Sequence, residues 1–399
     1  MVTYDYIIIG AGIAGLYSAY TIRKENPTAK IIIFEKDDRA GGRTMTTKFE
    51  GVDVVCGAGV GRKNKDYLLR ELISDLNVPT HEFYSTHNYT EKTKFKEQAI
   101  WLKTLKDAAN QTLDRMSFKG FANKVLGNYL YCKLVTAIGY TDLEKTDYND
   151  VLKYYGLDDT LKSWTGIHIP WNILIDNLVD YIGKRNIHLN TGIKSIKNIS
   201  DEYVECKTTH GDIYAAKKCI VATTIESIRK FFPDHEIYND IEGQPFLRVY
   251  ARFKGSVAIE AMKEKVTALT VVGPPIEKII PIAPDRGIYM ISYTDNASAL
   301  KIKEHLRDIR YLEGKVATSL DIPVEKLRNS IVNTQSHFWH IGTHYNKPLR
   351  AKYKNRAEFI RIAQRPAQNI YVVGEVVALH QGWVEGALES VLNARWSAR

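Results

Sequence analysis

Long apolar runs are missing from this sequence, in which no stretch of 18 or more consecutive apolar residues occurs. A helix that crosses a bilayer needs about 20 mainly apolar residues, so we expect no membrane-spanning helix. The short apolar run near the start, residues 6–9, has Asp5 beside it and no basic segment before it. We therefore interpret it as a first β-strand rather than a secretory signal, and expect a cytoplasmic protein.

Cysteine is also scarce, with only Cys56, Cys132, Cys206 and Cys219 in 399 residues. None of them belongs to a Cys-x-x-Cys pair, so their spacing supports neither a metal site nor a redox pair. Buried thiols in a reducing compartment are the simplest interpretation. No Ser-His-Asp or metal-ligand constellation is evident either.

Acidic residues are outnumbered, with 46 Asp and Glu against 55 Lys and Arg, which gives a net charge of +9. Such an excess is compatible with nucleic acid or an acidic membrane surface as a partner. The cations are scattered, however, and the densest stretch, Lys92–Lys106, is interrupted by Glu97. A solvated helix face explains that stretch better, so we expect no nucleic-acid partner. The sequence does not indicate an oligomeric state.

What the sequence does contain is an apolar run, Tyr6–Ile9, that leads into a Gly10-x-Gly12-x-x-Gly15 turn and then a helical pattern. The first glycine of such a unit permits a tight turn. The second lets backbone N–H groups approach a pyrophosphate, and the third lets helix and strand pack closely. A phosphate would lie at the positive end of the helix dipole. The pattern predicts a dinucleotide-binding unit.

A second apolar run, Ile31–Phe34, ends in Glu35, at the spacing from the glycine turn where an acid accepts hydrogen bonds from a ribose diol. By itself this unit allows NAD, NADP or FAD. The paired glycines before Arg43 follow closely, and we interpret them as a tight loop that directs Arg43 toward the cofactor. A plain surface turn with a solvated arginine is the alternative.

At both ends, the chain resembles the flavin-dependent amine oxidases, which include monoamine, polyamine and L-amino-acid oxidases. The N-terminal resemblance is the glycine motif with Glu35 and Arg43. The C-terminal resemblance is Gly374-Glu375 together with residues 382–387, Gly-Trp-Val-Glu-Gly-Ala. The whole resemblance covers the first 60 or so residues, residues 187–224 and the last 30 or so residues.

The fold that this resemblance implies is α/β, with a Rossmann-like FAD-binding lobe and a second α+β substrate lobe, each discontinuous in sequence. The substrate lobe would combine helices with a mixed or antiparallel sheet. We expect residues 1–79, 170–232 and 346–399 in the FAD-binding lobe, and residues 80–169 (helical part) and 233–345 (sheet part) in the substrate lobe. The period-2 alternation of apolar residues between 240 and 345 agrees with that sheet.

The cofactor that the resemblance implies is FAD. The residues expected to hold it are Gly10, Gly12, Ile13, Ala14, Gly15, Glu35, Lys36, Gly42, Arg43, Gly57, Ala58, Gly59, Ile193, Gly374, Glu375, Gly382, Trp383 and Val384. Ile193 would meet the adenine through its backbone, and Glu375 would approach the ribityl and pyrophosphate region. The turn at Trp383 would end at the flavin pyrimidine ring, where a helix N-terminus stabilises an anionic reduced flavin.

On the substrate side the family has aromatic walls, and the resemblance places Trp383 at one of them. Tyr345 would be its partner, or His344 if the register slips by one residue, and Trp339 would pack at the flavin edge. Core packing is the alternative for all of these aromatic side chains.

Two departures from the family pattern concern Arg248 and cysteine. Arg248 stands where the family often has a lysine that bridges through water to flavin N5, and a guanidinium keeps its charge where an ammonium is tunable. Some members attach FAD through a cysteine next to the aromatic wall, but Thr343 and His344 stand there instead. We therefore expect non-covalent FAD.

The activity that the resemblance implies is oxidation of an amine. A hydride passes from the carbon next to nitrogen to flavin N5, an imine is released, and oxygen is reduced to hydrogen peroxide. The substrate amine must be neutral, which a desolvated pocket favours. We expect a small-molecule amine and oxygen as partners, and Arg248, Trp339, Tyr345 and Trp383 as the catalytic residues. Two alternatives stay open: a related FAD enzyme that acts on carbon skeletons, such as a desaturase or protoporphyrinogen oxidase, and an FAD-fold binding protein with little turnover.

Overall fold

The first apolar run forms a strand inside a sheet in the computed structural model, which describes residues 3–111, 114–394 and 396. This strand, β1, pairs in parallel with β2 on one side and with β12 on the other, although β12 lies about 200 residues later in the chain. The sheet comprises β1 (Thr3–Ile9), β2 (Ile31–Phe34), β9 (Ile187–His188), β10 (Ile193–Asn198), β11 (Val204–Thr208), β12 (Ile213–Val221) and β18 (Ile370–Val372). We call it the nucleotide sheet.

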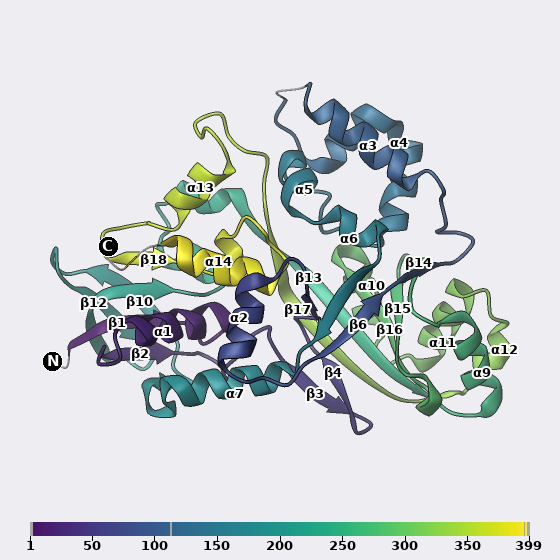
Figure 1. Ribbon diagram of the computed structural model, residues 1–399, viewed down its shortest axis with the longest axis horizontal. Helices are drawn as coiled ribbons and strands as arrows, with labels where there is room; N and C mark the ends of the chain where they lie inside the picture. The colour runs from purple at the N-terminus through teal and green to yellow at the C-terminus, as the bar shows by residue number, and fades with distance from the viewer. Residues whose placement is uncertain (1–2, 112–113, 395, 397–399) are drawn as a thin grey trace.

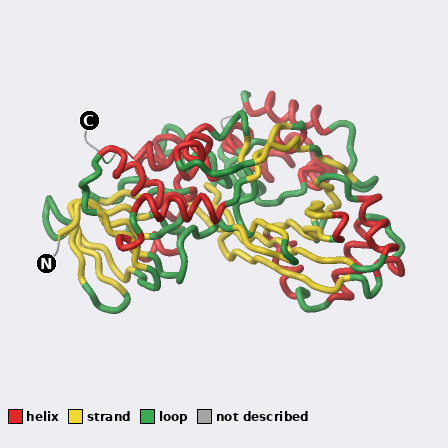
Figure 2. Tube along the Cα trace, turned by 60° about the horizontal axis from the view of Figure 1, so that its bottom comes forward, coloured by secondary structure: helices red, strands yellow, loops and turns green. Residues whose placement is uncertain are grey.

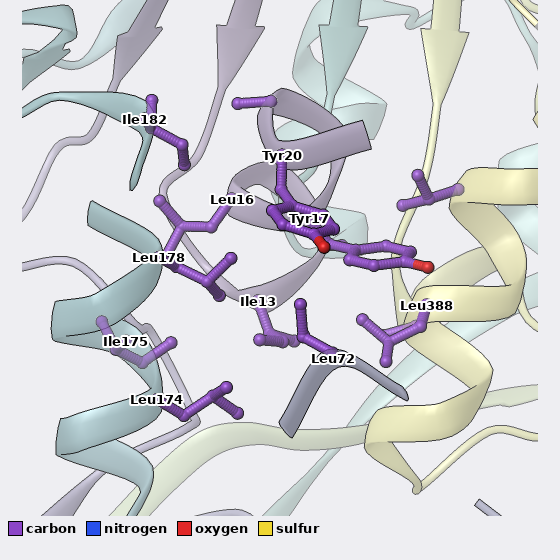
Figure 3. Close-up of a cluster of buried hydrophobic side chains, with 14 of the residues drawn as sticks. Ile13, Leu16, Tyr17, Tyr20, Leu72, Leu174, Ile175, Leu178, Ile182 and Leu388 are labelled. Atoms are coloured by element: carbon purple, nitrogen blue, oxygen red, sulfur yellow. The ribbon is translucent and has the colours of Figure 1, made fainter. Parts of the chain in front are cut away.

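Helices cover both faces of the nucleotide sheet, which is why β2 and the end of β1 are continuously apolar. All of β2 is buried, as is the end of β1. The helices of this part are α1 (Ile13–Glu25), α2 (Tyr67–Asp75), α7 (Trp171–Ile182), α8 (Ile225–Phe231), α13 (Arg356–Ala363) and α14 (Val384–Ala394). Figure 3 shows side chains of α1, α2, α7 and α14 pointing into one apolar core. Segments from both ends and the middle of the chain therefore build one lobe.

The second large sheet, here called the substrate sheet, is mostly antiparallel. Its order is β17-β13-β16-β15-β14-β7. The strands are β7 (His87–Tyr89), β13 (Ile241–Phe253), β14 (Leu269–Gly273), β15 (Glu277–Ala283), β16 (Ile288–Asp295) and β17 (Ile331–Asn346). Figure 2 shows this sheet and the nucleotide sheet as two separate groups of strands. The predicted α/β fold with two discontinuous lobes is confirmed.

The two faces of β13 have different neighbours, and this alternation positions the site. Leu247, Val249 and Ala251 pack in the core with α9 (Ser256–Lys265), α10 (Asn296–Glu304), α11 (Ile309–Ser319) and α12 (Val324–Leu327). The residues between them, Arg248 and Tyr250, point to the opposite face and reach the loop after β4 (Val52–Val55). Strand β4 pairs with β3 (Thr46–Phe49) as a small hairpin. The second face of β13 is thus directed toward the nucleotide lobe.

The segment predicted to be the helical part of the substrate lobe also contains strands. Its helices are α3 (Gln98–Ala109), α4 (Phe118–Ile138), α5 (Tyr148–Tyr154) and α6 (Leu157–Leu161), which gather at the top of Figure 1. Besides β7, it contributes β6 (His81–Ser85) and β8 (Trp164–His168), which pair with each other, and β8 also pairs with β5 (Gly61–Arg62). These short strands are rich in polar residues and have no clear apolar alternation, so the period-2 pattern did not reveal them.

Among the described residues, no helix is both long enough and apolar enough to cross a membrane.

Candidate functional site

The glycine turn after β1 leaves room at one of its three glycines and none at the other two. A Cβ atom on Gly15 would lie 1.9 Å from the carbonyl oxygen of Gly10, and one on Gly10 would lie 2.5 Å from that of Ala222. A Cβ atom on Gly12 would have no atom within 4 Å. Gly10 and Gly15 are therefore required by packing, whereas Gly12 borders open space. That is the space a pyrophosphate needs.

The N-terminus of α1 faces the same space. Gly12 is the N-cap of this helix, its cap position has no side-chain hydrogen bond, and the first turn contains no acidic residue. Ile13 and Ala14, predicted to bind FAD, are the first residues of the helix. The positive end of the helix dipole is thus free to receive an anion. The donor set fits a phosphate.

Glu35 is held beside this turn by two backbone donors. Its Oε2 accepts a hydrogen bond of 2.8 Å from the N–H of Ala11, and its Oε1 accepts one of 3.0 Å from Asp37. The Thr191 N–H donates to the Glu35 carbonyl at 2.7 Å, which brings the start of β10, with half-buried Ile193, next to Glu35 and exposed Lys36. The residues predicted to surround the adenosine are therefore neighbours.

The loop at residues 41–44 packs on the glycine turn, and the loop at residues 57–59 packs on the loop at residues 41–44. The Gly41 N–H donates to the Ala11 carbonyl at 2.8 Å, and the Ala58 N–H donates to the Arg43 carbonyl at 2.9 Å. A Cβ on Gly57 would lie 2.1 Å from the Arg43 carbonyl oxygen, so this second contact also requires a glycine. Gly42 lies against Gly12. Small residues thus form a layered backbone surface beside the open space.

Arg43 joins this surface to the C-terminal motif through Glu375. The Arg43 Nη1 lies 3.0 Å from Glu375 Oε2 and also donates to the Gly342 carbonyl at 2.8 Å. Glu375 is buried and accepts further hydrogen bonds from the backbone N–H groups of His344 and Gly382. Burial opposes ionisation of Glu375, but the surrounding donors, with His344 and Arg43 foremost, lower its pKa to about 2. Glu375 is therefore a carboxylate that organises the junction of the two chain ends.

His344 is the remaining partner of Glu375 and has one defined tautomer. Burial lowers the pKa of His344 and disfavours a charged ring. Its Nε2 accepts from the Ile225 N–H at 3.2 Å, so the proton is on Nδ1, which donates to Glu375 at 2.5 Å. His344 thus holds the acid in place, and its ring is directed toward Glu375.

Trp339 and Arg248 both hold the loop at residues 57–59, from the substrate sheet. The Trp339 indole N–H donates to the Cys56 carbonyl at 2.8 Å, and Arg248 Nη2 donates to the Gly57 carbonyl at 2.7 Å. The Arg248 guanidinium, 5% exposed, also lies 4.0 Å from the ring centre of Tyr293. The structure therefore brings Arg248 and Trp339 next to the predicted flavin loop.

Replacing Arg248 by lysine will loosen this loop, because one ammonium cannot both reach the Gly57 carbonyl and lie flat on Tyr293. We expect the free energy of unfolding to fall by about 1–3 kcal/mol, the cost of an unsatisfied buried polar group. Urea denaturation measures it. Arg252→Lys is the matched control, since Arg252 is on the same strand but makes a half-exposed ion pair with Glu50. Equal stability of the two variants would contradict this role for Arg248.

Trp383 stands at the start of α14, and one face of its ring is already covered. The Arg62 guanidinium lies 3.7 Å from the Trp383 ring centre and is held by Asp66 at 2.6 Å and Asp159 at 3.3 Å. Sequence analysis did not find Arg62, although it lies three residues after Gly59, the end of the loop predicted to meet the flavin. A substrate wall at Trp383 would therefore have to use the face opposite Arg62.

Neither Tyr345 nor Trp383 is among the residues that line the cavity beside Gly382. Tyr345 is buried near Glu242 and Arg229, whereas its neighbours Thr343 and His344 line a cavity that also borders Gly382. The cavity has about 360 Å³ of space unfilled by protein atoms, part of it continuous with solvent. Its walls are Asp142, Thr146, Asp150, Tyr154, Tyr155, Gln244, Thr343, His344, Leu379, Gln381 and Gly382. The role of Tyr345 as the second wall stays a prediction.

Most residues that line this cavity were missed by sequence analysis. Asp142 and Asp150 come from the helical segment, and Gln244 comes from the start of β13, so no local motif connects them. The segment between α4 and α5 reaches β13 and β17 through hydrogen bonds of Asp142 with Gln244 and of Asp147 with Asn346, which brings these walls together. The acids of the helical segment gave no indication of this cavity in the sequence.

Comparison with known proteins shows the family to which the chain belongs. Residues 142–394 match the family described as flavin containing amine oxidoreductase, and residues 8–76 match an NAD(P)-binding Rossmann-like domain. The FAD-dependent oxidoreductase dbaF of Emericella nidulans is 26% identical over 195 residues, which are 48% of this chain and 33% of that protein. The aligned part is thus about a third of that curated relative's length.

Solved structures with the same fold include a putrescine oxidase bound to putrescine and a cyclohexylamine oxidase from Brevibacterium oxydans. Each has a TM-score of 0.77 at 15% identity, with 98% of this chain and 97% of the other covered. At this identity the likeness shows the fold alone.

Proposed function

Because the chain belongs to the flavin-containing amine oxidoreductase family, we propose that it is an FAD-dependent oxidase of amines, which releases an imine and reduces oxygen to hydrogen peroxide. The observation that carries the cofactor assignment is the open space at Gly12, faced by an uncapped helix N-terminus and bordered by Glu35 and Arg43. A phosphate of FAD fits this donor set.

The adenosine half of FAD would be held by the glycine turn, Glu35 and the start of β10. The flavin half would lie toward the loop at 57–59, Trp339 and the turn at 382–384. When bound, FAD would supply the acceptor for a hydride from the carbon next to the substrate nitrogen.

The chain's own residues orient the reactants and exclude water. Arg248 and Trp339 fix the loop at 57–59, and the network of Arg43, His344 and Glu375 fixes the turn before α14. Burial of the site disfavours the ammonium form of a substrate, so the amine is held with its lone pair available. Trp383 offers its uncovered face to that amine.

Non-covalent attachment of FAD is part of the proposal. Thr343 and His344 occupy the positions next to the predicted wall, where a linking cysteine would be expected. Cys56 is close to the flavin loop, but it is buried, and burial raises its pKa to about 11, so its thiol is protonated and unreactive.

Anaerobic addition of amines to the purified yellow protein tests the proposal. We expect at least one of a set of mono-, di- and polyamines to bleach the flavin absorbance, and oxygen to restore it with formation of peroxide. Denaturation should release the flavin into the soluble fraction. A yellow protein that no amine or amino acid bleaches would point instead to a substrate oxidised at carbon or to a binding protein. A protein that cannot be loaded with FAD would refute the cofactor assignment.

A further inference from the structure

The loop that follows α4, residues 139–142, is held by the substrate sheet through backbone groups of Gly139, Thr141 and Asp142. Lys278 on β15 donates to the Gly139 carbonyl at 2.5 Å. Asp295 at the end of β16 accepts from the N–H groups of Thr141 at 3.0 Å and of Asp142 at 3.3 Å. These contacts fix the loop in one position relative to the sheet.

Gln244 completes the clamp from β13 and orients the last residue of the loop. Its side-chain amide donates to the Asp142 carbonyl at 3.0 Å and to the Thr343 hydroxyl at 3.2 Å. Asn296 in turn donates to the Gln244 side chain at 3.3 Å. Asp142 thereby lines the same cavity as His344 and Gly382.

The Asp142 carboxylate retains one oxygen for a ligand. The residue is 8% exposed, and its Oδ1 accepts a hydrogen bond from the Tyr155 hydroxyl. In the described part of the chain, Oδ2 receives no hydrogen bond and no cation pairs with it. The other carboxylate of the cavity, Asp150, is engaged by Arg356 at 2.6 Å. The cavity thus contains one preorganised carboxylate that still needs a donor.

Among the residues that the structure describes, no cation makes a direct ion pair with Asp142. The ammonium of Lys278 is committed to the Gly139 carbonyl and lies 2.7 Å from the ring centre of Tyr140. Arg43 is paired with Glu375. A ligand that brings its own ammonium group would satisfy Asp142, and Gln244 and Thr343 beside it are polar neighbours suited to a hydrated amine.

We propose that Asp142 binds a second ammonium group of the substrate, so that the preferred substrates are diamines or longer polyamines rather than simple monoamines. This inference rests on the proposed amine oxidase function. It assigns the cavity between α5 and the turn before α14 as the subsite for the end of the substrate that is not oxidised.

The affinity of this subsite depends on pH in a defined direction. Burial, followed by the neighbouring Asp295, raises the pKa of Asp142 to about 7, while Tyr155 and Lys278 lower it and Glu375 raises it. The carboxylate form that attracts an ammonium therefore becomes populated as pH rises through about 7. The KM for a diamine relative to that for a monoamine should fall over this range. Well below the amine pKa values of about 10, the deprotonated fraction of the reacting amine rises by the same factor per pH unit for both substrates.

Steady-state kinetics with 1,4-diaminobutane and 1-aminopentane, which have similar length, test the proposal in the FAD-loaded protein. Asp142→Asn should lower kcat/KM for the diamine by roughly 10- to 100-fold, as expected for loss of a charge-assisted hydrogen bond, mainly through KM. It should leave the monoamine almost unchanged and abolish the pH dependence of the KM ratio. Asp142→Glu should restore part of the diamine preference.

Asp107→Asn is the control for charge, since Asp107 lies in the same helical segment and makes only an exposed pair with Lys103. An equal effect of Asp142→Asn on both substrates, or a wild-type enzyme without preference for the diamine, would overturn the subsite. If no amine reduces the flavin, the proposed function itself fails. Calorimetric titration with 1,4-diaminobutane then decides the subsite alone: weaker binding by Asp142→Asn than by wild type supports it, and equal or no binding refutes it.

Discussion

Gly12→Ala will leave the protein as stable as the wild type but will greatly weaken FAD binding, whereas Gly15→Ala will disrupt the folded protein itself. The difference follows from the surroundings of the two glycines. An added methyl group on Gly12 meets only open space, but one on Gly15 meets the Gly10 carbonyl oxygen at 1.9 Å. Alanine normally stabilises a helix relative to glycine by about 1 kcal/mol. At Gly15 the overlap outweighs this gain, and we expect a net loss of about 3 kcal/mol.

Flavin titration and urea denaturation of the apoprotein separate these two effects. For Gly12→Ala we expect FAD affinity to fall by roughly 10- to 100-fold, because a methyl group that crowds a bound phosphate costs about 1–3 kcal/mol. Gly211→Ala is a poor control because of its positive φ, but Gly314→Ala, in open space within α11, is well matched. Unchanged FAD affinity of Gly12→Ala would show that the cofactor phosphates lie elsewhere.

Glu375→Gln will cause the second large loss, in both stability and FAD binding. The carboxylate accepts from Arg43, from the His344 ring and from two backbone N–H groups, and an amide would turn an N–H donor toward some of them. Removing one partner of a buried ion pair leaves the other charge uncompensated, so we expect a loss of about 3 kcal/mol. The turn before α14 would also lose its anchor at Gly382, and with it the flavin end of the site.

The pH dependence of unfolding identifies the carboxylate as the cause. Burial acts against ionisation, yet His344 and Arg43 lower the Glu375 pKa from its ordinary value of 4.5 to about 2. Its stabilisation is therefore complete above pH 4.5 and is lost as pH falls toward 2, and Glu375→Gln should remove this component. Glu389→Gln is the control, since Glu389 forms a half-exposed pair with His380 in the same C-terminal segment. A similar loss in both variants would contradict the special role of Glu375.

The part of the site that could be predicted from sequence is the part encoded locally. Glycine spacing, the strand before it and the acid after it depend on neighbours within 30 residues, and the turn has the expected form at Gly10, Gly12 and Gly15. The C-terminal turn at Gly382 was also found from a local motif. The backbone geometry of such motifs can be predicted from the glycines themselves, since a positive φ or a close backbone contact favours glycine over other residues.

The part that could not be predicted depends on the packing of distant segments. Asp142 reaches the cavity because Lys278, Asp295 and Gln244 clamp its loop, and these residues come from three different strands. Arg62 meets Trp383 only after β5 pairs with β8 and α14 packs on α2. Contacts between such distant segments cannot be predicted from the periodicity of apolar residues in the sequence.

Tyr345 shows where register decides the outcome. Alternation along a strand sends adjacent side chains to opposite faces, so an uncertainty of one residue exchanges the roles of Tyr345 and His344. The structure directs the His344 ring to Glu375 and buries Tyr345 near Arg229, with the cavity bordered by His344.

The ion pair between Arg43 and Glu375 joins residues separated by 332 positions, and Glu385 of α14 accepts from the first N–H groups of α2 at Leu68 and Leu69. A ribosome therefore releases the N-terminal glycine turn long before it makes the residues that complete the pocket. A nascent or prematurely terminated chain can form the strand and helix of that turn, but it lacks the acid that anchors Arg43. Binding of FAD would then occur only after the segment that carries Glu375 has docked, so that cofactor content reports synthesis of the chain through that segment.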